Sequence, residues 1–179
     1  MSDLNTPREV FFFFSILYRS DLFTKEAIIH KIHETLSIDL EFSHPHFPMK
    51  EYYSKEMGSV ENLKRIFFVS TKLLDRKNLV DLKIWATSFE KDHLIEKNRS
   101  INLDVGFISL EQVILATGKP YYHRVYLDHG VYANLELFQN EDEFKVFPWT
   151  YPDYAHVEIR HFFNYCRNLL KNSYSFSGS

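Results

Sequence analysis

The run VFFFFSILY at residues 10–18 constrains the fold of this chain more than any other segment. Successive side chains of a β-strand point to opposite faces, and here both faces are apolar. Such a strand is stable only where other elements cover it on both sides, so it is predicted to lie at the centre of a sheet. One face carries Val10, Phe12, Phe14 and Ile16, and the other carries Phe11, Phe13 and Leu17.

The first hundred residues predict an α+β fold with a ferredoxin-like βαββαβ core. Residues 24–36 have the pattern of an amphipathic helix with Thr24 as its N-cap, and a second helix follows Asp75 as its cap. Strands are predicted at residues 10–18, 38–42, 65–70 and 101–107, with a short helix at 49–58. This order of elements is that of a split βαβ unit.

The second half is predicted to extend this core by a short helix, an antiparallel hairpin, a further strand and a C-terminal helix. A capping-box pattern at Ser109–Gln112, with Gly118 as a stop signal, predicts the short helix at residues 110–117. The last helix is expected to have Asp153 as its cap. No linker interrupts the chain, so residues 1–179 are predicted to be one domain, with 1–9 and 173–179 as flexible tails.

Residues 121–137 are predicted to form the hairpin, around the three-residue loop Asp128-His129-Gly130. This register pairs Arg124 with Asn134 and Tyr126 with Tyr132. It also separates the side chains by chemistry, because strand neighbours alternate between faces. Val125, Leu127, Val131, Ala133 and Leu135 share an apolar face that should meet the core, and Tyr122, Arg124, Tyr126, Tyr132, Asn134 and Glu136 share a polar face.

The polar face of the hairpin has two interpretations. In the first, it is an ordinary sheet surface on which Arg124 bridges to Glu136 and the tyrosines stack. In the second it is a functional surface, because arginine binds carboxylate or phosphate bidentately and tyrosine adds a rigid ring with one hydroxyl. The candidate ligand-binding residues are Arg124, Tyr126, Tyr132, Asn134, Asp104, Glu56, Tyr53 and Tyr151.

Three functions are compatible with that surface. The first is binding of a small anionic ligand, a phosphate or a carboxylate, anchored by Arg124. The second is a structural or interaction role in which the same face meets a partner or a second copy, forming a homodimer. The third is an enzyme of unknown class, for which Asp104 and Glu56 are the candidate acid/base groups.

Composition and motifs exclude several other classes. A net charge of −3 without a basic cluster argues against nucleic-acid binding, and the apolar N-terminal run is too short to span a bilayer. The single cysteine, Cys166, favours a reducing cytoplasm and a buried thiol. His44 and His46 form an H-x-H pair without a third ligand, so no metal is expected. No glycine-rich phosphate loop is present, so no cofactor is expected either.

Four segments in order, YYSKEMG, NLDVGF, HRVYLDHGVYA and PWTYPDY, resemble the family catalogued as domain of unknown function 4416. The resemblance extends from FFFFSILY through the last helix, and the hairpin and the PWTYPDY segment are its most specific parts. It implies a bacterial cytoplasmic protein and supplies no reaction.

Overall fold

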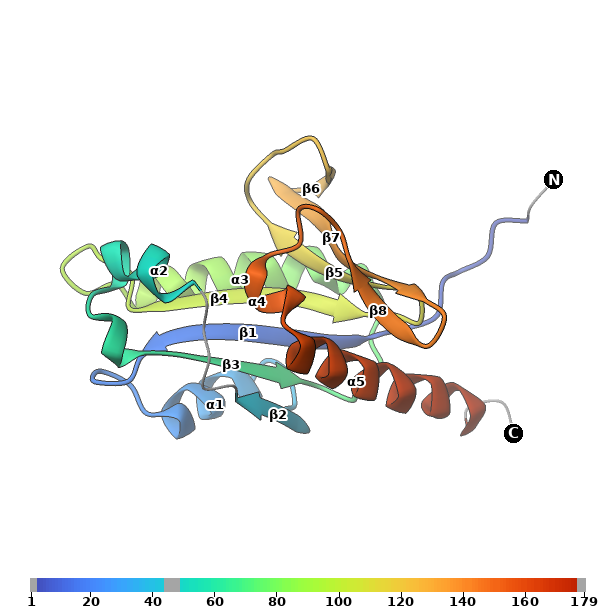
Figure 1. The fold of residues 1–179 in the computed structure, drawn as a ribbon, viewed down its shortest axis with the longest axis horizontal. Helices are drawn as coiled ribbons and strands as arrows, with labels where there is room; N and C mark the ends of the chain where they lie inside the picture. The colour runs from blue at the N-terminus through green and yellow to red at the C-terminus, as the bar shows by residue number, and fades with distance from the viewer. Residues whose placement is uncertain (1–2, 44–48, 177–179) are drawn as a thin grey trace.

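The computed structural model describes residues 3–43 and 49–176 and has an α+β fold, as predicted. Its strands form one antiparallel sheet in the order β2-β3-β1-β4-β5-β7-β6, and β8 pairs with β7 (Figure 1). The strands are β1 Phe11–Arg19, β2 Leu40–Ser43, β3 Leu63–Val69, β4 Ile101–Ile108, β5 Gln112–Thr117, β6 Arg124–Asp128, β7 Val131–Asn140 and β8 Glu143–Val146.

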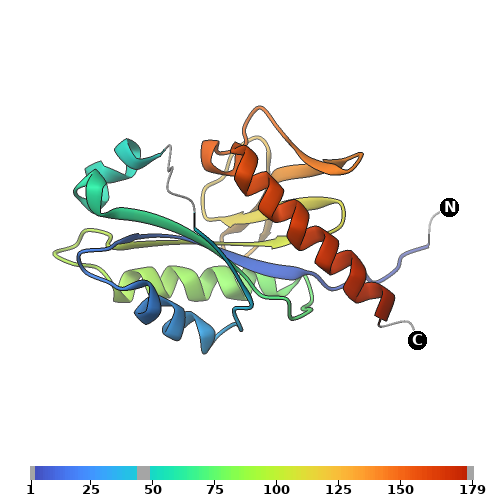
Figure 2. The same ribbon diagram turned by 60° about the horizontal axis from the view of Figure 1, so that its bottom comes forward.

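Helices cover both faces of the sheet (Figure 2). Helices α1 (Lys25–His33) and α3 (Asn78–Asp92) pack on one face, and α5 (Val157–Phe176) packs on the other. The second face also carries α2 (Lys50–Met57), which the short turn η1 (Val60–Asn62) follows, and the single-turn helix α4 (Pro152–Ala155), which directly precedes α5. In the described part of the chain, no helix is both long and apolar enough to cross a membrane.

The central position predicted for the first strand is confirmed. β1 pairs with β3 on one side and with β4 on the other. Its alternate side chains enter two different cores, because Phe12 and Phe14 pack against α1 and α3 whereas Phe11 and Phe13 pack against α5. The apolar character of both faces therefore follows from a three-layer arrangement.

Of the caps predicted for the first two helices, Thr24 is confirmed and Asp75 is not. The Thr24 hydroxyl accepts the backbone N–H of Ala27 and caps α1, as predicted. Asp75 accepts the N–H of Lys77 in the turn that precedes α3, which begins at Asn78. Helix α5 continues to Phe176, so residues 173–176 of the expected C-terminal tail are helical, and the Tyr174 hydroxyl donates to the carbonyl of Glu9.

The predicted helix at residues 110–117 is wrong, because this segment forms strand β5. The Ser109 hydroxyl does accept the N–H groups of Glu111 and Gln112, but it closes the turn of a hairpin between β4 and β5. The same local bonds serve a helix N-cap and a tight turn. The apolar segment from Val113 to Ala116 decides between them, because it is buried between both cores.

The hairpin register is confirmed at three pairs: Arg124 with Asn134, Val125 with Ala133, and Tyr126 with Tyr132. The loop is shorter than predicted, since Asp128 pairs with Val131 and a bulge between Tyr126 and Asp128 absorbs the extra residue. His129 and Gly130 both have positive φ, as a two-residue hairpin turn requires.

The prediction that the apolar hairpin face meets the core is wrong for β6. Val125 and Leu127 are 67% and 40% exposed, because β6 is the edge strand and none of the described helices covers it. On β7 the polar side chains Asn134 and Glu136 are buried instead. The segment from Trp149 to Tyr151 covers them: the Thr150 hydroxyl donates to the Glu136 carbonyl, and the Tyr151 N–H donates to its carboxyl group.

Candidate functional site

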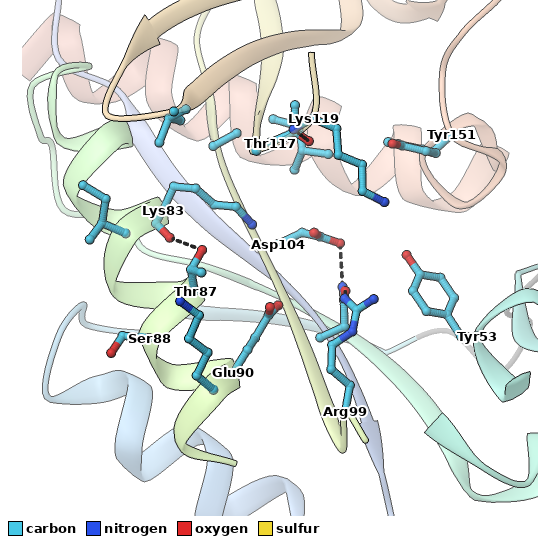
Figure 3. Close-up of a pocket in the computed structure, with 18 of the residues that line it drawn as sticks. Tyr53, Lys83, Thr87, Ser88, Glu90, Arg99, Asp104, Thr117, Lys119 and Tyr151 are labelled. Atoms are coloured by element: carbon cyan, nitrogen blue, oxygen red, sulfur yellow. Dashed lines mark hydrogen bonds between the residues drawn. The ribbon is translucent and has the colours of Figure 1, made fainter. Parts of the chain in front are cut away.

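The sheet opens between β4 and β5, and the opening forms a pocket of about 800 Å³ (Figure 3). The two strands pair only from Gly106 to Ile108, where Gly106 lies opposite Leu115. Beyond that point the β4 N–H of Leu103 is bound by the Glu90 carboxylate of α3 at 2.5 Å. The Glu90 side chain thus accepts a hydrogen bond that the backbone of a neighbouring strand would otherwise accept, and it keeps β4 and β5 apart.

A buried arginine organises the base of the pocket on the α5 side of the sheet. The Arg65 guanidinium, with its side chain 4% exposed, contacts Asp153 at 2.8 Å and the Ser15 hydroxyl at 2.7 Å. Asp104 lies 3.8 Å from the same nitrogen. Burial alone would lower the pKa of Arg65, but the two carboxylates outweigh burial and raise that pKa, so the arginine is permanently charged.

The outer edge of the pocket contains a second ion pair. Arg99, which precedes β4, donates to Glu56 of α2 at 2.5 Å and to the amide oxygen of Asn102 at 2.7 Å. Asn102 in turn donates to the carboxylate of Asp104 at 2.9 Å. Asp104 therefore stands between two arginines, with its side chain 23% exposed toward the pocket.

Two lysines extend into the pocket from opposite sides. Lys83 of α3 and Lys119, which follows β5, point their ammonium groups toward the space beside Asp104 (Figure 3). Neither ammonium has an ion pair among the residues that the structure describes. The lining holds five basic side chains and three acidic ones, an excess of positive charge in a chain whose net charge is −3. They are Arg65, Lys83, Lys91, Arg99 and Lys119 against Glu90, Asp104 and Asp153.

Arg124 lies behind the pocket wall rather than in it. Its guanidinium donates to the Tyr151 hydroxyl at 3.0 Å, to the carbonyl of Lys119 at 2.9 Å and to Asn134 at 3.4 Å. Tyr151 and Lys119 both line the pocket. Arg124 is therefore a positioning residue, which fixes one wall through two neighbours, and it makes no direct bridge to Glu136.

The buried carboxyl group of Glu136 is explained by a bulge in β7. Ile114 of β5 pairs with Leu135 and Val113 pairs with Leu137, so Glu136 has no partner across this ladder and turns beneath Tyr151. Burial raises the pKa of Glu136 to about 8, despite hydrogen bonds from Asn134 and from the Tyr151 N–H that favour the charged form. At neutral pH this group is mostly a neutral acid, so it does not cancel the positive charge of the pocket.

We expect the stability of the protein to fall as the pH rises from about 4.5 to about 8, partly because of Glu136. Its pKa is raised from the ordinary 4.5 to about 8 in the folded protein, which holds an additional proton between these values. The contribution is fully present below about pH 4.5 and is lost toward pH 8, by at most about 1.4 kcal/mol per pH unit. Urea unfolding across this range should give a flatter pH profile for Glu136→Gln than for wild type. An unchanged slope would contradict the assignment.

The structure brings together some of the predicted site residues and separates others. Asp104, Tyr53 and Tyr151 line the pocket. Arg124 and Glu56 are one contact removed, because Arg124 binds Tyr151 and Lys119 and Glu56 binds Arg99. Asn134 is two contacts removed, since its side chain binds Arg124. Tyr126 and Tyr132 make an edge-to-face contact with each other, at 5.4 Å between ring centroids, and do not line the pocket. The polar face predicted for the hairpin therefore supports the wall of the pocket from behind and does not itself form the pocket surface.

Sequence reasoning missed most of the charged groups in the pocket. Asp153 is not the cap of the last helix, because it lies within α4 and its carboxylate pairs with Arg65. The sequence contains one indication that Arg65 is special, because it is a charged residue among the inward-facing apolar residues of the strand RIFFVS. It contains no such indication for Lys83 and Lys119, since each resembles an ordinary surface lysine in its own segment.

Metal binding has no support in the described residues, which contain no cluster of three or more candidate ligands. The pair His44 and His46 lies outside the described residues. Cys166 lies on the buried face of α5, and burial raises the pKa of its thiol to about 12, so the thiol keeps its proton and is a poor nucleophile.

A family model described as "Domain of unknown function (DUF4416)" matches residues 8–170. Neither the search of curated proteins nor the search of solved structures gave a match. The family description names no ligand and no reaction, so a function can be inferred only from the chemistry of the pocket.

Proposed function

We propose that this chain, which belongs to the DUF4416 family, binds a small anionic molecule in the pocket between β4 and β5. The observation that carries the proposal is the pair of ammonium groups, Lys83 and Lys119, that point into one concave space and have no ion pair among the described residues. Phosphate and carboxylate are the anions that such groups bind with charge-assisted hydrogen bonds.

The surroundings of the two lysines support an anion rather than a cation. Arg65 is already neutralised by Asp153, and Arg99 by Glu56, so the two pairs shape the pocket without supplying free charge. The remaining carboxylates, Asp104 and Glu90, are each held by hydrogen bonds from the protein. The proposed role of Lys83 and Lys119 is to contact the anion, and that of Arg124 is to hold Tyr151 and Lys119 in place.

Removing the two lysine charges should weaken phosphate binding. We expect the double variant Lys83→Gln and Lys119→Gln to bind inorganic phosphate at least about 10-fold more weakly than wild type in calorimetric titration, because hydrogen bonds to charged groups contribute about 1.5–3 kcal/mol each. Acetate is the carboxylate probe in the same titration.

The control is Lys171→Gln, which removes one lysine charge from an exposed position of α5 outside the pocket. It should leave phosphate affinity unchanged. Equal affinities for all three proteins, or no binding of either anion to wild type, would exclude an anion site formed by these lysines.

A second candidate function, self-association, is favoured by the exposed edge strand β6. Val125 and Tyr126 are 67% and 56% exposed, and the strand has a neighbour on one side only. Antiparallel pairing of two copies about Tyr126 would place Arg124 of one copy opposite Asp128 of the other, and Val125 opposite Leu127. The sequence RVYLD is thus complementary to itself in charge and in hydrophobicity, as a two-fold symmetric interface requires.

If a second copy occupies this edge, Tyr126→Glu should abolish the association, because two like charges would meet at the symmetry axis. Sedimentation velocity should show a dimer for wild type and a monomer for the variant. Tyr52→Glu, at an exposed tyrosine of α2, is the control and should remain dimeric. A wild type that stays monomeric at high concentration rules this function out.

We further infer a ferredoxin-like βαββαβ unit from β1 to β4 and a cytoplasmic location. The sheet order β2-β3-β1-β4, with α1 and α3 on one face, supports the first inference. A single buried cysteine supports the second.

A further inference from the structure

The anion proposed above leaves an unsatisfied group at the base of the same pocket. Tyr154 of α4 lines the pocket and is 1% exposed, and its ring packs among Phe13, Phe67 and Phe163. Its hydroxyl is buried and has no hydrogen-bond partner among the described residues. Leaving a buried hydroxyl unpaired is costly, and natural proteins rarely do so without a reason.

Charged residues of the same pocket lining act on this hydroxyl. Asp104, Asp153 and Arg65, which all line the pocket, interact electrostatically with it. Burial, together with the charge of Asp104, raises the pKa of Tyr154 well above its ordinary value, so the hydroxyl keeps its proton and remains a donor and an acceptor.

Asp104 provides a second polar group at the same place. Its carboxylate receives one hydrogen bond, from Asn102, and a long contact from Arg65 at 3.8 Å. A carboxylate can accept about four hydrogen bonds, so Asp104 has capacity for donors from a ligand. The pocket lining therefore combines the free acceptor capacity of Asp104 with the unpaired hydroxyl of Tyr154. The ammonium groups of Lys83 and Lys119 point toward the space beside Asp104 (Figure 3).

We propose that the ligand is a hydroxylated anion, such as a polyol phosphate, whose anionic group binds Lys83 and Lys119 and whose hydroxyl groups bind Asp104 and Tyr154. This inference rests on the proposed anion site. Hydroxyl groups of a ligand suit both protein groups. A ligand hydroxyl can donate a hydrogen bond to the Asp104 carboxylate, and it can accept one from, or donate one to, the Tyr154 hydroxyl. An ammonium group fits less well, since Arg65, Arg99 and Lys83 already surround Asp104 with positive charge.

The test compares three phosphate monoesters in calorimetric titration: methyl phosphate, glycerol 3-phosphate, which adds hydroxyl groups, and phosphoethanolamine, which adds an ammonium group. Glycerol 3-phosphate should bind wild type most tightly. Tyr154→Phe should reduce its affinity about 5-fold, the effect of one lost hydrogen bond, and leave methyl phosphate unchanged. Asp104→Asn should remove the preference for glycerol 3-phosphate, while methyl phosphate binds equally or more tightly because a negative charge is gone.

Thermal unfolding separates a ligand role of Tyr154 from a structural one. Without ligand, Tyr154→Phe should have an unchanged or higher Tm, since it deletes an unpaired hydroxyl and keeps the ring. The thermal shift caused by glycerol 3-phosphate should become smaller. Tyr165→Phe, at an exposed tyrosine of α5, is the control and should change neither quantity.

The outcomes distinguish this inference from the proposed function. If methyl phosphate and glycerol 3-phosphate bind equally, or phosphoethanolamine binds most tightly, the anion site stands and the hydroxyl inference is wrong. A lower Tm of unliganded Tyr154→Phe with unchanged affinities would also overturn it. If no phosphate binds wild type, the proposed function itself fails.

Discussion

Replacing Asp153 with asparagine should destabilise the protein by about 3–5 kcal/mol, the usual cost of leaving one partner of a buried ion pair alone. Asparagine keeps the size of the side chain and removes only the charge that faces Arg65 at 2.8 Å. The arginine is buried, and Asp104 at 3.8 Å is too far to replace the lost contact fully. Urea denaturation of wild type and variant measures the difference.

The double variant Arg65→Met and Asp153→Leu is the informative comparison. It removes both charges of the buried pair, and Asp104, which loses its contact with Arg65 at 3.8 Å, is partly exposed and keeps the hydrogen bond from Asn102. The protein is therefore expected to be more stable than with Asp153→Asn alone. If Asp153→Asn costs less than about 1 kcal/mol, as surface pairs do, the pair does not organise the base of the pocket.

Gly106→Ala should be the second severe substitution, with a loss of about 3 kcal/mol or more from overpacking. A Cβ atom at this position would lie 2.3 Å from the carbonyl oxygen of Ile114 and 2.4 Å from the Phe13 ring. The first obstacle is backbone, which cannot rotate away. The clash falls at the last pair that joins β4 to β5, so relieving it would separate the strands further and deform the pocket.

Gly118→Ala is the matched control, because a Cβ atom there meets nothing within 4 Å. It should change the free energy of unfolding by less than about 0.5 kcal/mol, as for most surface positions. A tolerated Gly106→Ala, with phosphate binding intact, would mean that the close contact of β4 and β5 does not define the opening.

Patterns local to one element predicted much of this fold. Alternation placed β1 at the centre, helical spacing found α1, α3 and α5, and the chemistry of the hairpin gave the register that pairs Arg124 with Asn134. The error at residues 110–117 has the same origin, since the bonds of Ser109 are local and fit a helix start as well as a turn. Only the burial of β5 on both faces, a tertiary property, separates the two.

The pocket could not be predicted in the same way, because it depends on where two strands stop pairing. Nothing in the order of residues marks Gly106 as the last pair, or directs Glu90 of α3 to the N–H of Leu103. The pair of Arg65 and Asp153 joins residues far apart in the chain, and the bulge that buries Glu136 appears only in the pairing of β5 with β7. Such features arise from tertiary packing, so sequence patterns reached the supporting residue Arg124 but not the lysines.

The position of a bound anion is the most direct test of this account. A crystal soaked in arsenate, a phosphate analogue with anomalous scattering, should show a peak in the anomalous difference map between the ammonium groups of Lys83 and Lys119. A peak found only elsewhere, or an empty pocket at arsenate concentrations that saturate the protein in solution, would contradict it.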